Sequence, residues 1–268
     1  MASSPRLKVS MGTDHSKAGP EEPYNYDELD INEVGGYAVV DSDRLKRTGL
    51  PEAIYAPSKT QDQVLAIARK LLALDGPTIV TRCSESLARE LARPPYDLEI
   101  FPPLDSGFSY FTAVGKAMAP LDAKVALVSA GTSDLSVAHE AEATLFALGI
   151  ETELISDVGV AGIHRLFERL NMILRADLVI VIAGMEASLA SVVGGLVSSP
   201  VVAVPTSTGY GSSFEGITAT LSMLASCAPG VSIVGIDNGF GAAAVASKIV
   251  QASLRARRTG FDHGDLTR

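Results

Sequence analysis

The sequence predicts an α/β protein whose second half folds as a three-layer αβα sandwich around a parallel sheet, preceded by a smaller α/β domain. Three observations predict this. Five short apolar segments rich in Val, Ile and Leu recur from residue 124 onward, and segments of helical periodicity separate them. The chain of 268 residues is 47% hydrophobic, which is enough to bury a core of this size. Strands alternating with helices are typical of a Rossmann or flavodoxin-like sheet covered on both faces.

The chain divides into four predicted parts. Residues 1–28 are rich in Ser, Pro, Gly, Glu and Lys without apolar periodicity, and we expect a disordered arm there. A small α/β domain is predicted for residues 29–119 and the parallel-sheet domain for 120–256, with Pro120 near the boundary. Residues 257–268 are expected to form a flexible tail.

The small domain is predicted from two strand and helix pairs and one further strand. The predicted elements are a strand at 52–55, a helix at 60–73, a strand at 78–81, a helix at 85–92 and a short strand between the proline pairs 94–95 and 102–103. Cys83 follows one of these strands, and we expect it to have a structural role.

The predicted strands of the parallel sheet indicate where a ligand would bind. They are residues 125–129, 151–155, 178–183, 201–204 and 231–236. In open sheets of this kind the ligand crevice lies beyond the carboxyl ends of the strands. The loops that follow the strands are therefore the candidate functional segments.

The loop after the first strand is a predicted anion site. Its glycine lets backbone N–H groups approach an anion, and Ser133 or Asp134 can cap the following helix. A glycine turn with a helix cap and no ligand would have the same sequence. The candidate residues of this loop are Ser129, Gly131, Thr132, Ser133 and Asp134.

Carboxylates follow the second and third strands. Asp157 precedes a helix that bears His164 and Arg165, and Glu186 stands at the end of the third strand. A helix cap and a surface histidine are simpler interpretations of Asp157 and His164. Close packing explains the small residues after Glu186 but does not explain Glu186 itself.

The loop after the fourth strand, residues 206–216, is long for a strand-to-helix connection and combines hydroxyls, glycines and two aromatic side chains. Long ordered loops in compact domains are usually functional. This loop could bind phosphate and stack a planar ring on Tyr210 or Phe214. The ligand-binding residues predicted in the later loops are Gly184, Met185, Thr206, Ser207, Gly209, Tyr210, Gly211, Asn238 and Gly239.

Cys227 is the predicted nucleophile. It lies in Ser-Cys-Ala-Pro-Gly just before the fifth strand, where loop backbone positions the thiol and a ligand could reach it. A cysteine within a strand, by contrast, mostly packs as a small hydrophobic residue.

Composition excludes several classes of partner. The net charge of −9 makes nucleic acid an unexpected ligand. Because residues 121–250 hold few cations, a phosphate ligand must rely on backbone N–H groups, helix N-termini, a divalent metal, or Arg165 and Lys248. Two cysteines and the lack of a secretory leader pattern favour a reducing, cytoplasmic setting. The most apolar region, 178–205, is interrupted by Gly and Pro, and we expect no membrane segment.

Six motifs taken together resemble the LarB family. They are Ser129–Asp134, Asp157–Arg165, Gly184–Glu186, Val204–Gly211, Ser226–Gly230 and Ile236–Gly241. Residues 47–52 and 59–60 also resemble the amino-terminal domain of that family. Members make pyridinium-3,5-biscarboxylic acid mononucleotide for the nickel-pincer cofactor, and they share a domain with the PurE aminoimidazole ribonucleotide (AIR) carboxylases. The chain departs from the usual family sequence at 187–190 and 214–218.

The resemblance implies a PurE-like domain and a homo-oligomer that acts on nicotinic acid adenine dinucleotide and CO2 or bicarbonate. It implies carboxylation of the pyridinium ring and hydrolysis of the phosphoanhydride to release AMP, with Cys227 as covalent nucleophile. Asp157 and Glu186 are candidate bases for the ring proton, and we expect a Mg²⁺ ion at the anion site.

Two other functions remain open at this stage. One is a PurE-like AIR carboxylase or mutase, which needs no thiol because its substrate ring is already an enamine. Val160 falls near the position of the PurE histidine and disfavours that reaction. The other is a non-catalytic nucleotide-binding module, in which Cys227 and Glu186 could change without altering affinity.

Overall fold

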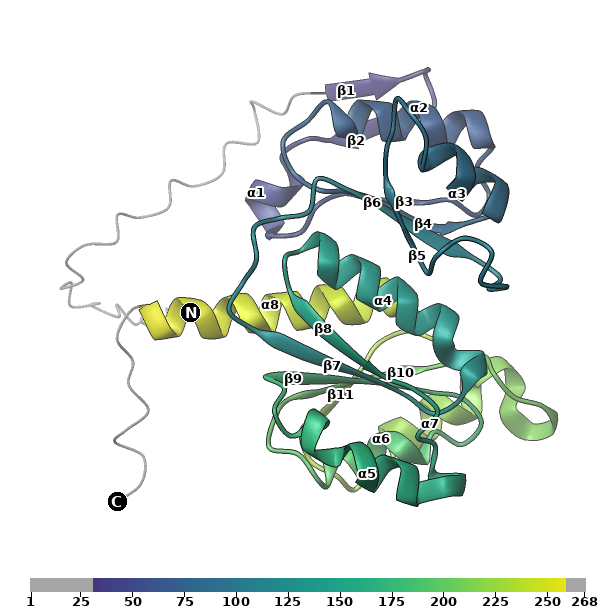
Figure 1. Ribbon diagram of the computed structural model, residues 1–268, viewed down its shortest axis with the longest axis vertical. Coiled ribbons are helices and arrows are strands. Elements are labelled where there is room, and N and C mark those ends of the chain that lie inside the picture. Colours follow the sequence, from purple (N-terminus) through teal and green to yellow (C-terminus); the bar gives the residue numbers. More distant parts are fainter. Residues whose placement is uncertain (1–30, 259–268) are drawn as a thin grey trace, which may run out of the picture.

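A computed structural model describes residues 31–258, which form two α/β domains joined through two helices (Figure 1). The predicted arm at 1–28 and residues 259–268 of the predicted tail lie outside the described residues. The last helix includes Arg257 and Arg258, so it extends two residues into the segment predicted as a tail.

The first domain is built on a four-stranded sheet with the order β3-β4-β6-β5 and carries a separate hairpin of β1 and β2. Its elements are β1 (Ile31–Val34), β2 (Ala38–Asp41), α1 (Arg44–Thr48), β3 (Ala53–Tyr55), α2 (Gln61–Leu72), β4 (Thr78–Cys83), α3 (Glu85–Leu91), β5 (Glu99–Phe101) and β6 (Phe111–Gly115). The hairpin, α1 and β6 were not predicted. β6 pairs antiparallel with both β4 and β5, so it holds the centre of this sheet.

The start of α2 shows how local sequence fixes an element. Thr60 and Gln63 form a capping box, in which the Gln63 N–H donates to Thr60 Oγ1 at 3.2 Å and the Thr60 N–H donates to Gln63 Oε1 at 3.0 Å. The apolar face of this helix is buried in the core of the first domain, at Val64, Ile67 and Leu71.

The second domain confirms the predicted fold class. Its five strands are all parallel, in the order β11-β10-β9-β7-β8. The elements are β7 (Lys124–Ser129), α4 (Leu135–Ala147), β8 (Glu151–Ile155), α5 (Ile163–Ile173), β9 (Leu178–Ala183), α6 (Ser188–Gly194), β10 (Val201–Pro205), α7 (Ile217–Leu224), β11 (Val231–Ile233) and α8 (Gly239–Arg258). β11 ends at Ile233 rather than at the predicted residue 236, because only three of its residues pair with β10.

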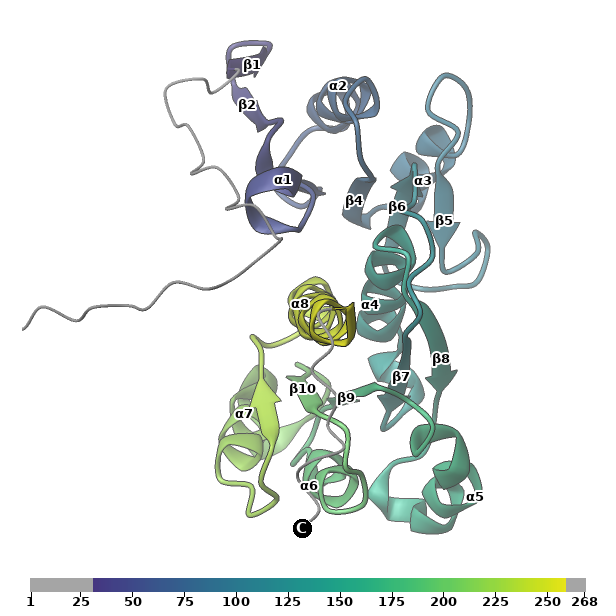
Figure 2. The same ribbon diagram turned by 90° about the vertical axis from the view of Figure 1, so that its left-hand side faces the viewer.

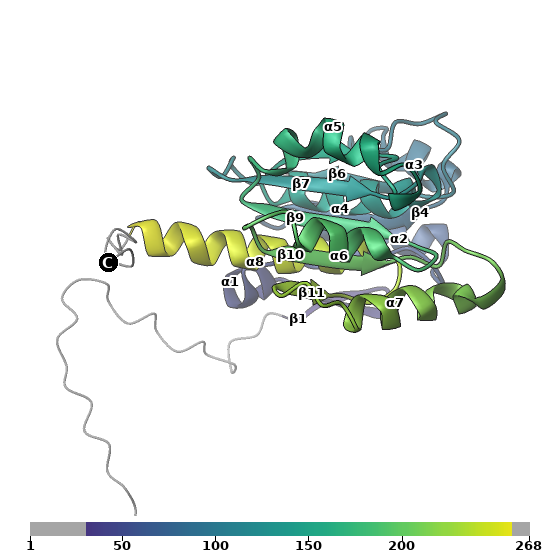
Figure 3. The same ribbon diagram turned by 90° about the horizontal axis from the view of Figure 1, so that it is seen from below.

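Helices cover both faces of the parallel sheet. α5, α6 and α7 pack on one face (Figure 3). α4 and α8 pack on the other, where they lie between the two domains (Figure 2). The apolar region 178–205 forms β9, α6 and β10, as expected. Of the helices between residues 31 and 258, none combines the length and the apolar character needed to cross a bilayer.

α4 is buried on two sides. Val137, Ala141 and Leu145 pack in the same core as residues of the parallel sheet. On its opposite side Ala143 and Ala147 pack against Ile79 and Val114 of the first domain. Alanine side chains allow the sheet of the first domain to approach the helix closely. The two domains therefore share α4 as a common packing element.

Candidate active site

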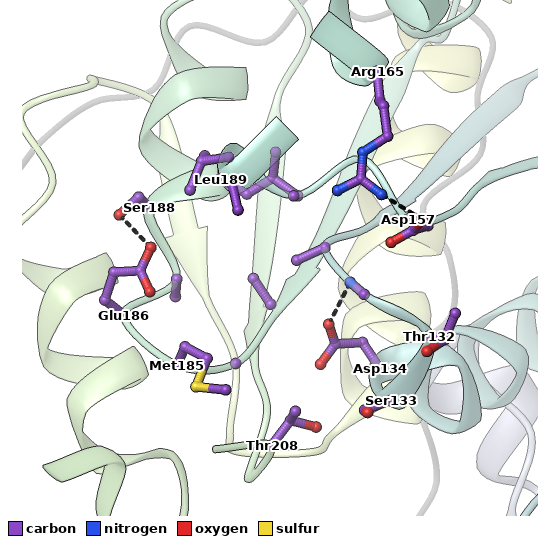
Figure 4. A pocket seen from close by; sticks show the side chains of 18 residues that line it. Thr132, Ser133, Asp134, Asp157, Arg165, Met185, Glu186, Ser188, Leu189 and Thr208 are labelled. Atoms are coloured by element: carbon purple, nitrogen blue, oxygen red, sulfur yellow. Dashed lines mark hydrogen bonds and ion pairs between the residues drawn. The ribbon is translucent and has the colours of Figure 1, made fainter. Parts of the chain in front are cut away.

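A pocket of about 350 Å³ opens at the carboxyl ends of β7, β8 and β9. Its volume falls in the range of small-molecule sites. Figure 4 shows that side chains from three successive strand-end loops face the same space. The predicted residues that line it are Gly131, Thr132, Ser133, Asp134, Asp157, Gly184, Met185 and Glu186.

The first loop is held by the carboxylate of Asp134. The Gly131 N–H donates to Asp134 Oδ2 at 2.9 Å, and the Thr206 hydroxyl donates to Oδ1 at 2.6 Å. Burial raises the pKa of Asp134, and the hydrogen bonds from Thr206 and Gly131 partly offset this rise. The expected cap of α4 by Ser133 or Asp134 is not made, because the Asp134 carboxylate binds these groups instead. Asp134 thus fixes the loop that carries the backbone N–H groups.

The second loop and the helix after it place a negatively charged and a positively charged side chain at the pocket. Asp157 adopts a left-handed backbone conformation, with φ of 56°, and its Oδ2 accepts a hydrogen bond from Arg165 (Figure 4). The Gly159 N–H donates to the Ala130 carbonyl at 2.9 Å, and a side chain at Gly159 would lie 2.8 Å from that oxygen. Glycine is therefore needed for the second loop to lie against the first.

The third loop supplies Glu186 at the rim. The Met185 N–H donates to the Thr208 carbonyl at 2.8 Å, and a Cβ added to Gly184 would lie 2.3 Å from the same oxygen. Glu186 is exposed, and its Oε1 accepts a hydrogen bond from the Ser188 hydroxyl at 3.0 Å. Thr208 lines the pocket although we did not predict it; its position inside the hydroxyl-rich loop 206–216 was the available signal.

Several predicted residues do not line this pocket but support the loops that do. Ser129 and Thr206 are buried beneath the first loop. The Ser207 N–H donates to Asp237 Oδ1 at 2.8 Å, and Asn238 Oδ1 accepts from the Gly241 N–H at 2.7 Å. Gly209, Tyr210, Gly211 and Gly239 do not line the pocket either, and Tyr210 is 81% exposed.

Cys227 is exposed and lies away from the pocket within one chain. It precedes β11, so it is found at the amino ends of the parallel strands, whereas the pocket is at their carboxyl ends. The hydroxyl of its neighbour Ser226 contacts the hydroxyl of Ser191 on α6 at 2.8 Å, and Ser191 does not line the pocket. Within residues 31–258, no three His, Cys, Asp or Glu side chains are grouped closely enough to hold a metal ion by themselves.

The two cysteines are expected to differ sharply in reactivity. Cys83 is buried, and burial raises the pKa of its thiol to about 12, which leaves almost no reactive thiolate near neutral pH. A thiol reagent should therefore modify Cys227 in the folded protein and both cysteines after denaturation. Counting modified thiols by mass spectrometry, with Cys227→Ala as the control, tests this. Rapid modification of Cys83 in the folded protein would contradict it.

Comparison with known proteins adds two family matches. The AIR carboxylase family model matches residues 124–261, and the model of the LarB/PurE-like N-terminal domain matches residues 31–100. An uncharacterized protein of Methanocaldococcus jannaschii is 39% identical over 219 residues, which cover 79% of this chain and 83% of that protein. The N5-carboxyaminoimidazole ribonucleotide mutase of the same organism is 36% identical over 131 residues, covering 47% of this chain and 78% of the mutase.

Proposed function

Because the chain belongs to the LarB family, in which a LarB/PurE-like N-terminal domain precedes an AIR carboxylase domain, we propose that it is a carboxylase acting on nicotinic acid adenine dinucleotide. The enzyme would add a carboxyl group to C5 of the pyridinium ring and hydrolyse the phosphoanhydride. The products would be pyridinium-3,5-biscarboxylic acid mononucleotide, for the nickel-pincer cofactor, and AMP. The main support is a strand-end pocket with a glycine-containing loop and two carboxylates, in a chain with one exposed thiol.

The chemistry explains why a thiol is needed. C5 of a pyridinium ring is too poor in electrons to attack CO2. When the Cys227 thiolate adds to C4, the new C–S bond sends a ring electron pair to the nitrogen and makes C5 part of an enamine. C5 then forms a bond to CO2, a base removes the C5 proton, and the C–S electrons leave with the thiolate as the ring becomes aromatic again.

The pocket offers groups suited to the anionic substrate and to the ring proton. Arg165 and the backbone N–H groups around Gly131 could bind phosphate oxygens. Of the two candidate bases, Asp157 is engaged by Arg165, whereas the Ser188 hydroxyl is the only partner of Glu186 within residues 31–258. Glu186 is therefore the better candidate for accepting the C5 proton.

A Mg²⁺ ion would be compatible with this pocket. Mg²⁺ is commonly bound by one or two carboxylates together with substrate phosphates and water, so Asp157 would suffice if the diphosphate completes the site, which leaves Glu186 free as the base. When bound, the ion would neutralise negative charge on the diphosphate as the phosphoanhydride is cleaved.

Cys227 could meet this pocket if a second copy of the chain supplied it. The helix before Cys227 has an exposed apolar face of Ile217, Leu221 and Leu224, whose side chains are 52%, 60% and 66% exposed. The apolar residues of α6 and α8, by contrast, are largely used in the cores on the two faces of the parallel sheet. We therefore propose a homo-oligomer in which the α7 face packs against a neighbour and brings Cys227 to the neighbour's pocket.

The direct test is to incubate the protein with the dinucleotide, bicarbonate and Mg²⁺ and to identify the products by mass spectrometry. We expect AMP together with a mononucleotide heavier by one carboxyl group. If the dinucleotide is recovered unchanged under conditions in which the protein is folded, the proposal is wrong.

A second candidate is an AIR carboxylase or mutase, which the similarity to the N5-carboxyaminoimidazole ribonucleotide mutase favours. That reaction would leave the exposed thiol without a role. In addition, the described residues that line the pocket include Val160 but no histidine. Turnover of an aminoimidazole ribonucleotide, with none of the dinucleotide, would support this second function.

A further inference from the structure

An arginine of the first domain binds two segments of the second domain. The guanidinium of Arg82 pairs with both oxygens of Glu140 on α4, with Nε at 3.1 Å from Oε1 and Nη2 at 3.5 Å from Oε2. Nη2 also donates to the backbone carbonyl of Asp237. The rings of Tyr110 and Tyr55 flank the guanidinium at 5.3 and 5.7 Å. Two aromatic rings and two acceptors thus fix its orientation.

The backbone at Arg82 is shaped for this contact. The register of β4 and β6 shifts between Val80 and Cys83, and Arg82 has a left-handed φ of 56°. A bulge of this kind re-aims one side chain out of the regular alternation of a strand. A left-handed backbone is unfavourable for a residue with a side chain, so it persists only where surrounding contacts hold it.

Glu140 gives Arg82 a buried anchor. Its side chain is 2% exposed, and its Oε2 also accepts from the N–H groups of Gly239 and Phe240, at 3.1 and 3.4 Å. Glu140 therefore holds the first turn of α8 while Arg82 neutralises it. Burial raises the pKa of Glu140, and the ion pair with Arg82 opposes this rise.

A continuous series of hydrogen bonds runs from Asp237 to the pocket. The Asp237 N–H donates to the Pro205 carbonyl at 2.8 Å, and its carboxylate accepts the Ser207 N–H at the same distance. Two residues that follow β10 contact residues that line the pocket. Thr206 binds Asp134, and the carbonyl of Thr208 accepts the Met185 N–H.

We propose that Arg82 is a positioning residue through which the first domain holds two pocket-supporting loops, residues 205–209 and 237–241. It binds Glu140 and the Asp237 carbonyl together, which keeps Asp237 in place to hold Ser207. The planar fork of arginine can reach two acceptors on different segments, whereas the compact charge of lysine cannot do so in the same geometry. The effect on turnover rests on the proposed function, but the effect on the loops does not.

Hydrogen exchange of the intact protein measures the loops directly. In Arg82→Met, amides in 205–209 and 237–241 should exchange at least about tenfold faster, while amides of α5 on the far face stay unchanged. Arg89→Met is the matched control, because Arg89 also binds two acceptor groups, the carboxylates of Glu85 and Asp105, but only within the first domain. That control should leave exchange in both loops as in the wild type.

A double variant separates positioning from loss of folding. Arg82→Met leaves a buried charge on Glu140 without its partner, which could unfold the chain. Arg82→Met with Glu140→Gln removes that charge and keeps an acceptor for Gly239. The melting temperature of this double variant should lie closer to that of the wild type than the melting temperature of the single variant does. The amides of both loops should nevertheless still exchange fast. If the folded double variant exchanges in both loops as slowly as the wild type, the proposed role of Arg82 is wrong.

Turnover of the dinucleotide provides the second readout. We expect kcat/KM to fall about 10- to 100-fold in the double variant and to be unchanged in Arg89→Met. Equal turnover in the double variant and the wild type would also overturn the positioning role. If the wild type does not turn over the dinucleotide at all, the proposed reaction fails, and the exchange measurement still decides whether Arg82 holds the loops.

Discussion

Replacing Cys227 by alanine is expected to abolish carboxylation of nicotinic acid adenine dinucleotide while the fold stays intact. Removal of a covalent nucleophile typically lowers kcat by about 10⁴-fold or more, because no other group makes the intermediate. Cys227 is exposed and lies in a loop, so its loss leaves no cavity. The carboxylated mononucleotide is measured by mass spectrometry, and the fold by circular dichroism and thermal unfolding.

Cys83→Ala is the matched control for this experiment. It removes the buried thiol of the first domain, which should lower stability by about 1 kcal/mol or more through the small cavity left behind but should preserve turnover. Cys227→Ser should be as inactive as Cys227→Ala, because a hydroxyl is a poorer nucleophile and a poorer leaving group than a thiolate. Full activity in either Cys227 variant would exclude covalent catalysis by this residue.

The second large effect is a recovery of activity when two inactive variants are combined. Cys227→Ala and Glu186→Gln should each be inactive alone. If Cys227 serves the pocket of a neighbouring copy, unfolding and refolding an equal mixture should restore about a quarter of the wild-type activity. That fraction follows because half of the pockets keep Glu186, and half of those meet an intact Cys227.

The controls for this mixture are each variant refolded alone and the double variant refolded alone, all of which should be inactive. Size-exclusion chromatography of the wild type should show an oligomer. If the mixture stays inactive although mixed oligomers form, the thiol and the pocket of one active site come from the same chain.

Much of the parallel-sheet domain could be predicted because its strands are continuous apolar segments with helices between them. β8 and β9 have the predicted bounds, and β7 and β10 differ by a single residue. β6 could not be predicted in the same way. It is a short segment after a Ser- and Gly-rich stretch, and its central position depends on antiparallel partners that are distant in sequence.

The candidate site was predictable at the level of loops but not at the level of side chains. Strand ends identified the segments around Gly131, Asp157 and Glu186, which the structure brings to one pocket. Sequence could not show that Thr206 faces Asp134, or that Ser207 is held by Asp237, because these contacts depend on where neighbouring loops meet.

The pair of Arg82 and Glu140 was missed for a related reason. The two residues are 58 positions apart and lie in different domains, so no local pattern connects them. Glu140 sits on the side of α4 that a one-sided amphipathic pattern assigns to solvent, and the bulge that redirects Arg82 leaves no mark in the amino-acid sequence.

The double burial of α4 limits how this protein can be recombined with others. In a protein made of the parallel-sheet domain alone, the outer side of α4 would face water and would need polar side chains. Here that side carries Ala143 and Ala147, which pack against apolar residues of the first domain, and Glu140, whose carboxylate pairs with Arg82 of the first domain. A chimera in which the first domain is replaced by that of a distant relative must therefore replace the outer residues of α4 as well. The interface between the domains includes this helix, so a boundary placed in the linker alone would separate matched residues.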